Sequence, residues 1–201
     1  FLGKKFIGFE KPPPLLQKES LNDWWGGHES DNEIYNTTVW MIADMFTQYY
    51  DVNIGQDVLN LLKKCRVNIK VVSPKSSIVA MISCGLLNEA KNELKMLYSQ
   101  LENISKNDLI VGIEPSEVLV WRDEALNLIH GKPLNVLLFE ELLLKLDSLE
   151  VLPKFNTLNS KVWVHEHCHQ KVLAETSNLI KVLALIPQLQ VEIINSGCCG
   201  M

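Results

Sequence analysis

Two short segments near the carboxyl end of the 201-residue chain hold most of the side chains that could do chemistry. Residues 165–170 are His-Glu-His-Cys-His-Gln, and residues 197–200 are Gly-Cys-Cys-Gly. Thiolates and imidazoles are the ligands that zinc and iron–sulfur clusters take. Because two adjacent cysteines fit poorly into one relaxed tetrahedron, two metals or a larger cluster suit Cys198 and Cys199 better than a single zinc ion. The sequence therefore predicts a metal site that uses three thiols with imidazoles beside them.

Composition argues against several other classes of protein. The chain has 19 basic and 24 acidic residues, a formal charge of −5, which argues against a nucleic-acid binder with a general basic surface. No apolar run reaches the roughly 20 residues of a membrane-spanning helix, and the first residues do not form a signal peptide. Five cysteines in such a chain favour metal binding or buried thiols over a disulfide scaffold. We expect a location in the cytoplasm, or peripheral to the inner membrane, with no direct membrane span.

Apolar segments alternate with helical patterns from residue 37 onward, which predicts an α/β fold with a mainly parallel sheet. The expected strands are 39–43, 67–72, 109–113, 162–164 and 191–194, and the expected helices are 53–65 with Asn53 as its cap, 85–101, 117–129, 135–147 and 172–185. In parallel sheets the chemistry usually lies in loops at the carboxyl ends of strands. Residues 165–170 and 197–200 both follow an expected strand, so we expect them at one sheet edge.

The strand–helix–strand pattern occurs twice, which predicts two pseudo-repeated βαβ units with flanking helices. Residues 39–40 and 162–163 are both Val-Trp, and the closing strands match in the same order. In this alignment Met45 corresponds to Cys168, and Ser76-Ser77 corresponds to Cys198-Cys199. We assign the first unit to residues 37–130 and the second to residues 131–201, and we expect the second to stop before it is complete.

Residues 1–36 have a different character. A Pro-Pro-Pro run at 12–14 favours an extended segment, and Trp24 and Trp25 follow without a steady period. We assign this stretch to an extended linker or docking arm. Tryptophans are costly to leave in water, so two placements stay open for them: on another surface, or on this same domain.

Several stretches together resemble the CCG cysteine-rich domain, a family that includes a subunit of heterodisulfide reductase. In particular they are similar to the C-terminal iron–sulfur oxidoreductase part of FAD-linked oxidases that act on 2-hydroxy acids. The matching residues are 44–50, 83–90, 112–116, 121–124, 167–171 and 197–201. His-Cys-His-Gln at 167–170 and Cys-Cys-Gly at 198–200 are the most specific of them.

The resemblance implies a metal-binding, electron-transfer domain. Its ligands would be Cys168, Cys198 and Cys199, with His167 and His169 as ligands or as hydrogen-bonding neighbours. They would hold an iron–sulfur cluster, such as 4Fe–4S, or zinc. FAD would lie in the parent protein and not in this chain, since the sequence has no GxGxxG motif. The partners would be an FAD-binding oxidase domain and a ferredoxin-like segment, and the flavin would oxidise a 2-hydroxy acid such as glycolate, lactate or 2-hydroxyglutarate.

The first unit departs from the family pattern. The family has Cys-Cys-Gly-Arg where residues 76–79 are Ser-Ser-Ile-Val, and Cys where this chain has Glu117. The first half therefore does not carry the usual cluster, because serine is a poor substitute for a thiolate. The lost thiols suggest one alternative, a degenerate, metal-free docking module. A zinc-stabilised structural domain is a further alternative.

Other candidates have simpler explanations. Glu114 and Glu117 could form an acid/base pair, but a solvated helix N-terminus explains them better. Asp44 could anchor a ligand, although helix capping is the default. Residues 122–124, Arg-Asp-Glu, are typical of a charge cluster on a helix surface. Cys84 could be a remaining ligand, although an ordinary cysteine at a helix start is favoured.

Overall fold

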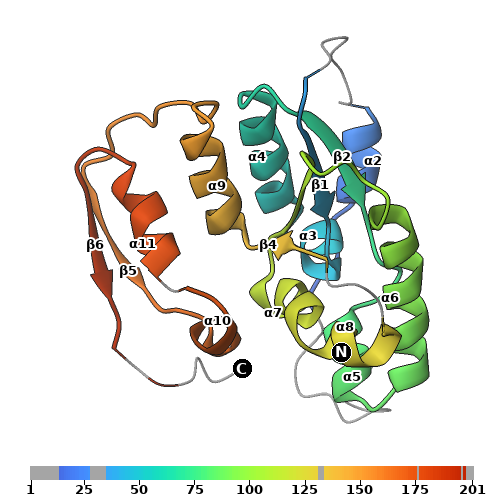
Figure 1. Ribbon diagram of the computed structural model, residues 1–201. Coiled ribbons are helices and arrows are strands. Elements are labelled where there is room, and N and C mark those ends of the chain that lie inside the picture. The colour runs from blue at the N-terminus through green and yellow to red at the C-terminus, as the bar shows by residue number, and fades with distance from the viewer. Residues whose placement is uncertain (1–13, 28–34, 131–133, 176, 196, 198–201) are drawn as a thin grey trace.

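The computed structural model (Figure 1) describes residues 14–27, 35–130, 134–175, 177–195 and 197. The strands are β1 (Thr38–Ile42), β2 (Asn68–Val72), β3 (Leu109–Gly112), β4 (Val136–Leu137), β5 (Ser160–Val164) and β6 (Leu189–Ile193). The helices are α2 (Leu21–Gly26), α3 (Met45–Tyr49), α4 (Val52–Lys63), α5 (Ile78–Ser83), α6 (Leu87–Leu101), α7 (Pro115–Leu119), α8 (Glu124–Ile129), α9 (Phe139–Ser148), α10 (Cys168–Leu173) and α11 (Ser177–Ala184), with a 3₁₀ turn η1 (Val120–Arg122).

The strands form two parallel sheets, which confirms the predicted fold class. The first has the order β2-β1-β3-β4, and the second consists of β5 and β6. All of the strand pairs are parallel, with Val39 opposite Ile69 in the first sheet and Val162 opposite Val191 in the second. In each sheet a strand leads through a short helix and a longer helix to the neighbouring strand: β1–α3–α4–β2, and β5–α10–α11–β6. This is the pseudo-repeat that the sequence predicted.

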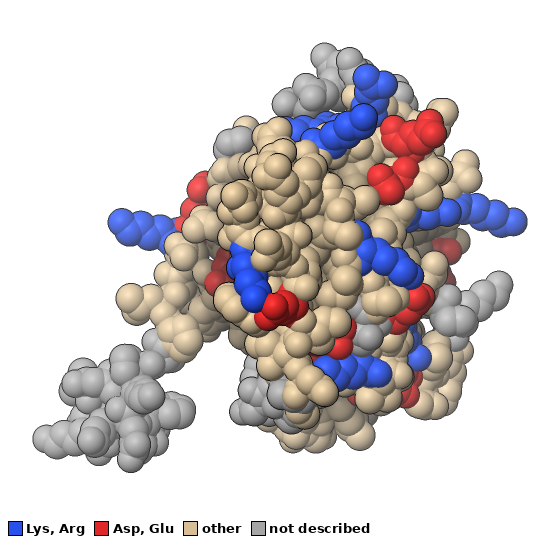
Figure 2. Space-filling view, turned by 90° about the vertical axis from the view of Figure 1, so that its left-hand side faces the viewer, with Lys and Arg blue, Asp and Glu red and all other residues tan. Residues whose placement is uncertain are grey.

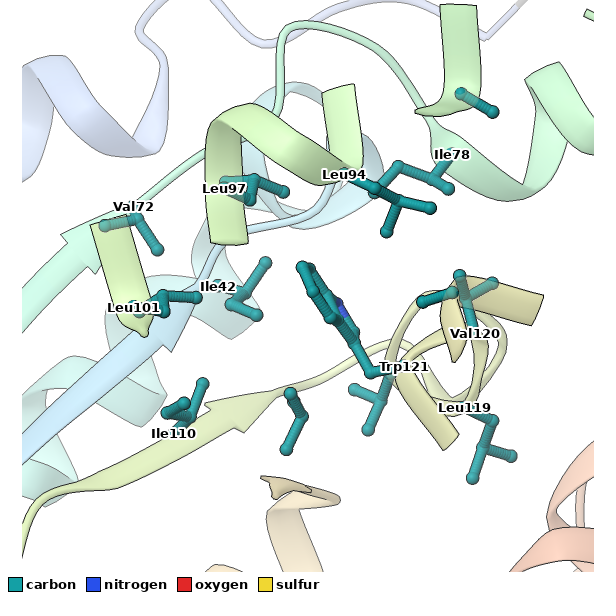
Figure 3. Packing of buried hydrophobic residues seen from close by; sticks show 14 of the residues in the cluster. Ile42, Val72, Ile78, Leu94, Leu97, Leu101, Ile110, Leu119, Val120 and Trp121 are labelled. Carbon is teal, nitrogen blue, oxygen red and sulfur yellow. The ribbon is translucent and has the colours of Figure 1, made fainter. Parts of the chain in front are cut away.

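Side chains of the first sheet alternate between two hydrophobic clusters, one on each face, because successive strand residues point to opposite sides. Ile42 and Ile110 face a cluster formed with α5 to α8, whereas Met41 and Val111 face a cluster formed with α2, α4 and α9. Figure 3 shows Trp121 at the centre of the first cluster, its ring directed among residues of the sheet and α6. Burial on both faces explains why the two central strands, β1 and β3, are largely apolar runs.

Two glycines permit close packing of helices around this sheet. A Cβ added at Gly112 would lie 2.4 Å from Cγ2 of Val118, so the glycine lets α7 approach β3. A Cβ at Gly55 would lie 2.5 Å from Cδ2 of Leu21, so the glycine lets α2 lie against α4. In β3 and in α4, a tertiary contact thus requires a residue as small as glycine.

The described part of the N-terminal stretch packs on the first unit. Ser20 caps α2 by accepting a hydrogen bond from the Asp23 N–H, and the side chains of Leu21 and Trp25 are buried in the same cluster as Met41. Trp24 packs against that cluster too. Of the two placements left open for the tryptophans, packing on this same domain is the one observed. Residues 1–13 and 28–34 lie outside the described residues.

β4 and α9 also belong to the packing of the first sheet. Val136 of β4 pairs with Ile110 of β3. Leu142 and Leu146 of α9 are fully buried in the cluster that contains Val39. Because α9 also packs against α11, it lies between the two sheets, as Figure 1 shows.

The second sheet is less covered by helices than the first. Helix α11 packs against β6, and Val164 and Val182 are buried there. The other face is open: the Trp163 side chain is 60% exposed, and its Nε1 donates to Oε2 of Glu192 at 3.0 Å. Figure 2 views the molecule from this side, and scattered charged side chains stand in a larger area of uncharged surface.

Several predicted helix limits were wrong. Helix α4 begins at Val52 after Asp51, so Asn53 is inside the helix and not its cap. The helix predicted at 135–147 starts later, because residues 136–137 form β4. The predicted 85–101 helix begins at Leu87, and Cys84 is the C-cap residue that follows α5 rather than a helix start.

Two predicted helices are each broken into shorter ones. The helix predicted at 117–129 begins at Pro115, whose fixed φ suits the first helical position, and it is interrupted at Asp123, with φ −130° and ψ −84°. The helix predicted at 172–185 is two helices, because Ala174 is extended and ends α10. At Asp123 apolar residues at helical spacing continue across the break, whereas the break after Ala174 coincides with four polar residues, 175–178.

Candidate metal centre

The residues after β5 and after β6 come to the same sheet edge. The two strands are parallel, with Val164 opposite Ile193, and the Ile194 N–H donates to the Val164 carbonyl at 2.8 Å. Lys171 of α10 then reaches the loop after β6, where its Nζ donates to the Gly197 carbonyl at 3.3 Å. Cys198 and Cys199 follow Gly197 in sequence but lie outside the described residues.

Helix α10 positions the first motif. His167 is its N-cap residue, with an extended backbone, and Nδ1 of His167 is buried and makes no hydrogen bond within the described part of the chain. The Cys168 side chain is exposed, and Gln170 is 5% exposed and donates to Oε1 of Glu140 on α9. The helix is thus held against α9 by Gln170, while the Cys168 thiol remains accessible.

His169 points to a different set of donors. Its ring and the carboxylates of Asp123 and Glu124 bring their possible ligand atoms within 4.8 Å of one another. Among the residues that the structure describes, this is the one group of three or more His, Cys, Asp or Glu side chains so arranged. His167 and Cys168 do not belong to it.

Asp123 and Glu124 were predicted to be a charge cluster on a helix surface, and the structure gives them and Arg122 more specific contacts. Arg122 joins η1 to α9: its Nη1 donates to Oε1 of Glu141 at 3.1 Å, and Nη2 donates to the Val136 carbonyl at 2.9 Å. Asp123 and Glu124 turn toward α10. Residues 121–124 are among the stretches that resemble the family, so the sequence does single them out. Their proximity to His169 arises from the tertiary fold and could not be predicted from sequence spacing.

The corresponding edge of the first sheet has no thiols among its described residues and is closed by hydrogen bonds. Ser77 caps α5 by accepting from the Ala80 N–H at 3.1 Å, and its hydroxyl donates to Oε1 of Glu117 on α7. The backbone N–H groups of Ile78 and Val79 also donate to this carboxylate. Burial nevertheless dominates and raises the pKa of Glu117 above its usual range, and the nearby Asp44 carboxylate acts in the same direction.

Glu117 therefore overturns one prediction. A solvated helix N-terminus does not describe it, because its side chain is only 7% exposed and faces α5. Glu114 does have the expected local role: it caps α7 and accepts from the Ser116 hydroxyl at 2.8 Å. The two carboxylates have different environments because Glu114 precedes the helix while Glu117 lies on its packed side.

Asp44 has the capping role that was favoured. One carboxylate oxygen accepts from the N–H groups of Phe46 and Thr47 at 2.9 and 3.0 Å, and the other accepts from the Thr47 hydroxyl at 2.7 Å. Asp44, Glu114 and Glu117 line a small cavity at the carboxyl ends of β1 and β3. Since Asp44 and Glu114 are used in caps and Glu117 binds α5, these carboxylates already have protein partners.

The two remaining cysteines lie away from these edges or on the surface. Cys65 is fully buried, its Sγ lies 3.3 Å from the Leu61 carbonyl, and burial raises the pKa of its thiol to about 11. Such a thiol packs as a small apolar group and does not act as a nucleophile. Cys84 is exposed at the end of α5.

The chain is similar over its whole length to segments of known oxidoreductases. It is 30% identical to D-2-hydroxyglutarate dehydrogenase of Escherichia coli K12, with all of this chain and 21% of that protein covered. It is 24% identical to one subunit of the anaerobic glycerol-3-phosphate dehydrogenase of the same organism, with 97% of this chain and 51% of that subunit covered. A D-2-hydroxyglutarate dehydrogenase of Pantoea ananatis is 26% identical, with 94% and 20% covered.

The chain thus spans about a fifth to a half of the length of these relatives. No family model matches the sequence. No solved structure matches it either. Within the described residues, no helix is both long enough and apolar enough to cross a membrane.

Proposed function

We propose that this chain is a CCG-type metal domain of an FAD-linked oxidoreductase, and that it relays electrons from a flavin in another domain. Cys168, Cys198 and Cys199 serve as ligands of an iron–sulfur cluster, and His167 and His169 are ligands or neighbours of the ligands. The observation that carries the proposal is the sheet edge at which β5 and β6 end together. That edge receives both the segment with Cys168 and the segment that leads into Cys198.

The donor chemistry of the described residues fits such a group. The Cys168 thiol is exposed at the start of α10, and thiolates are the usual ligands of iron–sulfur clusters. His167 presents a buried Nδ1 that has no hydrogen-bond partner within the described residues. A buried polar atom of this kind is costly unless a ligand or water satisfies it. A bound cluster would accept and pass on single electrons.

The relatives support the electron-transfer role and suggest the substrate class. One kind is named for the oxidation of D-2-hydroxyglutarate and the other is a subunit of a glycerol-3-phosphate dehydrogenase. Both names describe the removal of hydrogen from a hydroxyl-bearing carbon of a small acidic metabolite. The chain covers only part of each relative. We therefore propose that the substrate is oxidised in a separate FAD-binding domain, and that this chain, together with a ferredoxin-like segment, carries the electrons away from the flavin.

The lost thiols of the first sheet keep one alternative open, a metal-free docking module. Ser77 and Glu117 stand where the family has cysteines, and they bind each other. A zinc-stabilised structural domain is a second alternative, because thiolates and imidazoles are also zinc ligands, although the adjacent Cys198 and Cys199 suit a single zinc ion less well than a larger cluster.

The test follows electrons through the natural polypeptide that contains this chain, purified without oxygen. Cys168→Ser is compared with Cys84→Ser, which changes an exposed thiol outside the proposed site. We expect Cys168→Ser to retain reduction of the flavin by substrate and to lose transfer to an external acceptor by at least tenfold, while Cys84→Ser retains both. Transfer that survives both Cys168→Ser and Cys198→Ser would refute the proposal and favour the docking module. Zinc without iron would favour the structural domain.

A further inference from the structure

The contact between α8 and α10 contains a second arrangement of ligand atoms, separate from the thiols. Asp123 and Glu124 lie where α8 begins, and His169 lies on the first turn of α10. The three side chains therefore join the unit built on the four-stranded sheet to the unit built on β5 and β6. Their possible ligand atoms all lie within 4.8 Å of one another.

That spacing is close to what a metal ion needs. Three atoms within 4.8 Å of one another share a central point no more than about 2.8 Å from each, whereas zinc sites have nitrogen and oxygen ligands at about 2.0–2.2 Å. Side-chain movements of less than about 1 Å would close the difference, and the exposed side chain of Asp123 has room for them. The donor set, one imidazole and two carboxylates, suits a divalent transition metal with an open fourth position.

A separate observation points to a missing partner at the same place. Oε2 of Glu124 is buried and accepts no hydrogen bond within the described residues. An unpaired buried carboxylate oxygen is one of the costlier groups a folded chain can hold, so a cation or an ordered water is expected there.

The surrounding charge favours a cation. Glu140 of α9 also faces α10, where it accepts a hydrogen bond from Gln170. The nearby guanidinium of Arg122 is directed at Glu141 and the Val136 carbonyl instead. Three carboxylates, those of Asp123, Glu124 and Glu140, thus lie next to α10. The neighbouring guanidinium of Arg122 is bound to the carboxylate of Glu141.

We propose that Asp123, Glu124 and His169 bind a divalent transition metal ion of the zinc type, which fixes α10 to the start of α8. The ion would hold the helix that carries Cys168 in a constant position relative to the first unit. The site needs none of the three thiols, so it does not depend on the electron-transfer role proposed above. It uses His169 as a ligand of this ion, so that of the two roles given to His169 in that proposal only that of a neighbour of the thiol ligands remains.

Cobalt(II) binding to the chain with Cys168→Ser, Cys198→Ser and Cys199→Ser tests the proposal, because removal of these thiols leaves the proposed site intact. We expect one equivalent of cobalt to bind with visible d–d absorption and without the near-ultraviolet charge-transfer band of a cobalt–thiolate bond. His169→Gln and Glu124→Gln should each weaken binding at least tenfold. The matched controls His130→Asn and Asp147→Asn change an exposed imidazole and an exposed carboxylate outside the site and should leave affinity unchanged.

Two results would overturn the proposal. One is the absence of saturable cobalt binding to a chain that lacks these three thiols and that circular dichroism shows to be folded. The other is binding that His169→Gln and Glu124→Gln do not weaken. Protection of α10 from limited proteolysis by zinc provides an independent measurement, and we expect Glu124→Gln to lose that protection. The electron-transfer proposal can fail in the natural polypeptide without affecting this result, and the reverse also holds.

Discussion

At the carboxyl-end edges of the two sheets the strands and helices follow in the same order, but the side chains differ in their chemistry. In the first, Asp44 caps the helix after β1, and Ser77 after β2 binds the buried Glu117. In the second, His167 is the cap residue after β5, and its neighbour Cys168 is exposed. One edge satisfies these polar groups within the protein, whereas the other presents a thiol and an imidazole nitrogen that has no hydrogen-bond partner among the described residues.

If the proposed function holds, this difference indicates how one copy of a duplicated fold can lose a metal site. A thiolate ligand replaced by serine no longer binds a soft metal, but a hydroxyl can cap a helix and donate to a carboxylate. Ser77 does both. Glu117 accepts the hydroxyl and the N–H groups at the start of α5, so the link between α5 and α7 is kept by hydrogen bonds.

The largest effect that separates the two edges should come from Glu117→Ala in the metal-free chain. The change removes a buried side chain and leaves the Ser77 hydroxyl and two N–H groups without their acceptor, so we expect a loss of about 2–4 kcal/mol in the free energy of unfolding. Cys168→Ser at the exposed edge should change it by about 0.5 kcal/mol or less. Urea unfolding of both variants measures this contrast, and equal losses would show that the first edge is not the more tightly closed.

A smaller effect is expected from Ser77→Ala. It removes the cap of α5 and the hydroxyl partner of Glu117, which together stabilise the fold by about 1–2 kcal/mol. Ser76→Ala is the matched control, because Ser76 is the exposed neighbour in the same Ser-Ser pair and should change stability by about 0.5 kcal/mol or less. Thermal unfolding compares the two, and a control as destabilised as Ser77→Ala would argue against a specific role for Ser77.

The smallest effect concerns pH. Burial raises the pKa of Glu117 in the folded chain above its ordinary value of 4.5, so the folded state holds this proton more tightly than the unfolded state does. Its stabilising contribution is present below pH 4.5 and is lost as the pH rises through the folded-state pKa. Glu117→Gln should gain stability relative to the unchanged chain between acidic and neutral pH.

Urea unfolding of both chains at several pH values measures this dependence. Burial also raises the pKa of Glu140, so a residual slope of the same sign should remain in Glu117→Gln. If the difference in the free energy of unfolding between the two chains does not vary with pH, the raised pKa of Glu117 is contradicted.

Much of the fold could be predicted because buried parallel strands are recognisable as apolar runs. All five expected strands overlap observed ones, whereas β4, with only two residues, was assigned to a helix. The helix break at Asp123 could not be predicted, because apolar residues at helical spacing, such as Trp121 and Ala125, continue across it. The break at Ala174 had a signal in the sequence, since four polar residues, 175–178, interrupt the apolar pattern there.

The site could be predicted only in part. Cys168 and His167 follow β5 as expected, because a motif directly after a strand must lie at the sheet edge. Burial of Glu117 could not be predicted, since it arises from contact with α5, and the meeting of His169 with Asp123 depends on how α10 docks. Sequence spacing fixes which edge a residue occupies, but not which helix lies against it.

The most direct test of the central claim is the metal content of the natural polypeptide, purified without oxygen, in three forms: unchanged, Cys168→Ser and Glu117→Gln. On our account the first edge is closed by hydrogen bonds and the second holds the metal. We therefore predict iron and sulfide in the unchanged protein, their loss in Cys168→Ser, and an unchanged content in Glu117→Gln. Neither iron nor zinc in the unchanged protein, or an equal loss in both variants, would contradict the account.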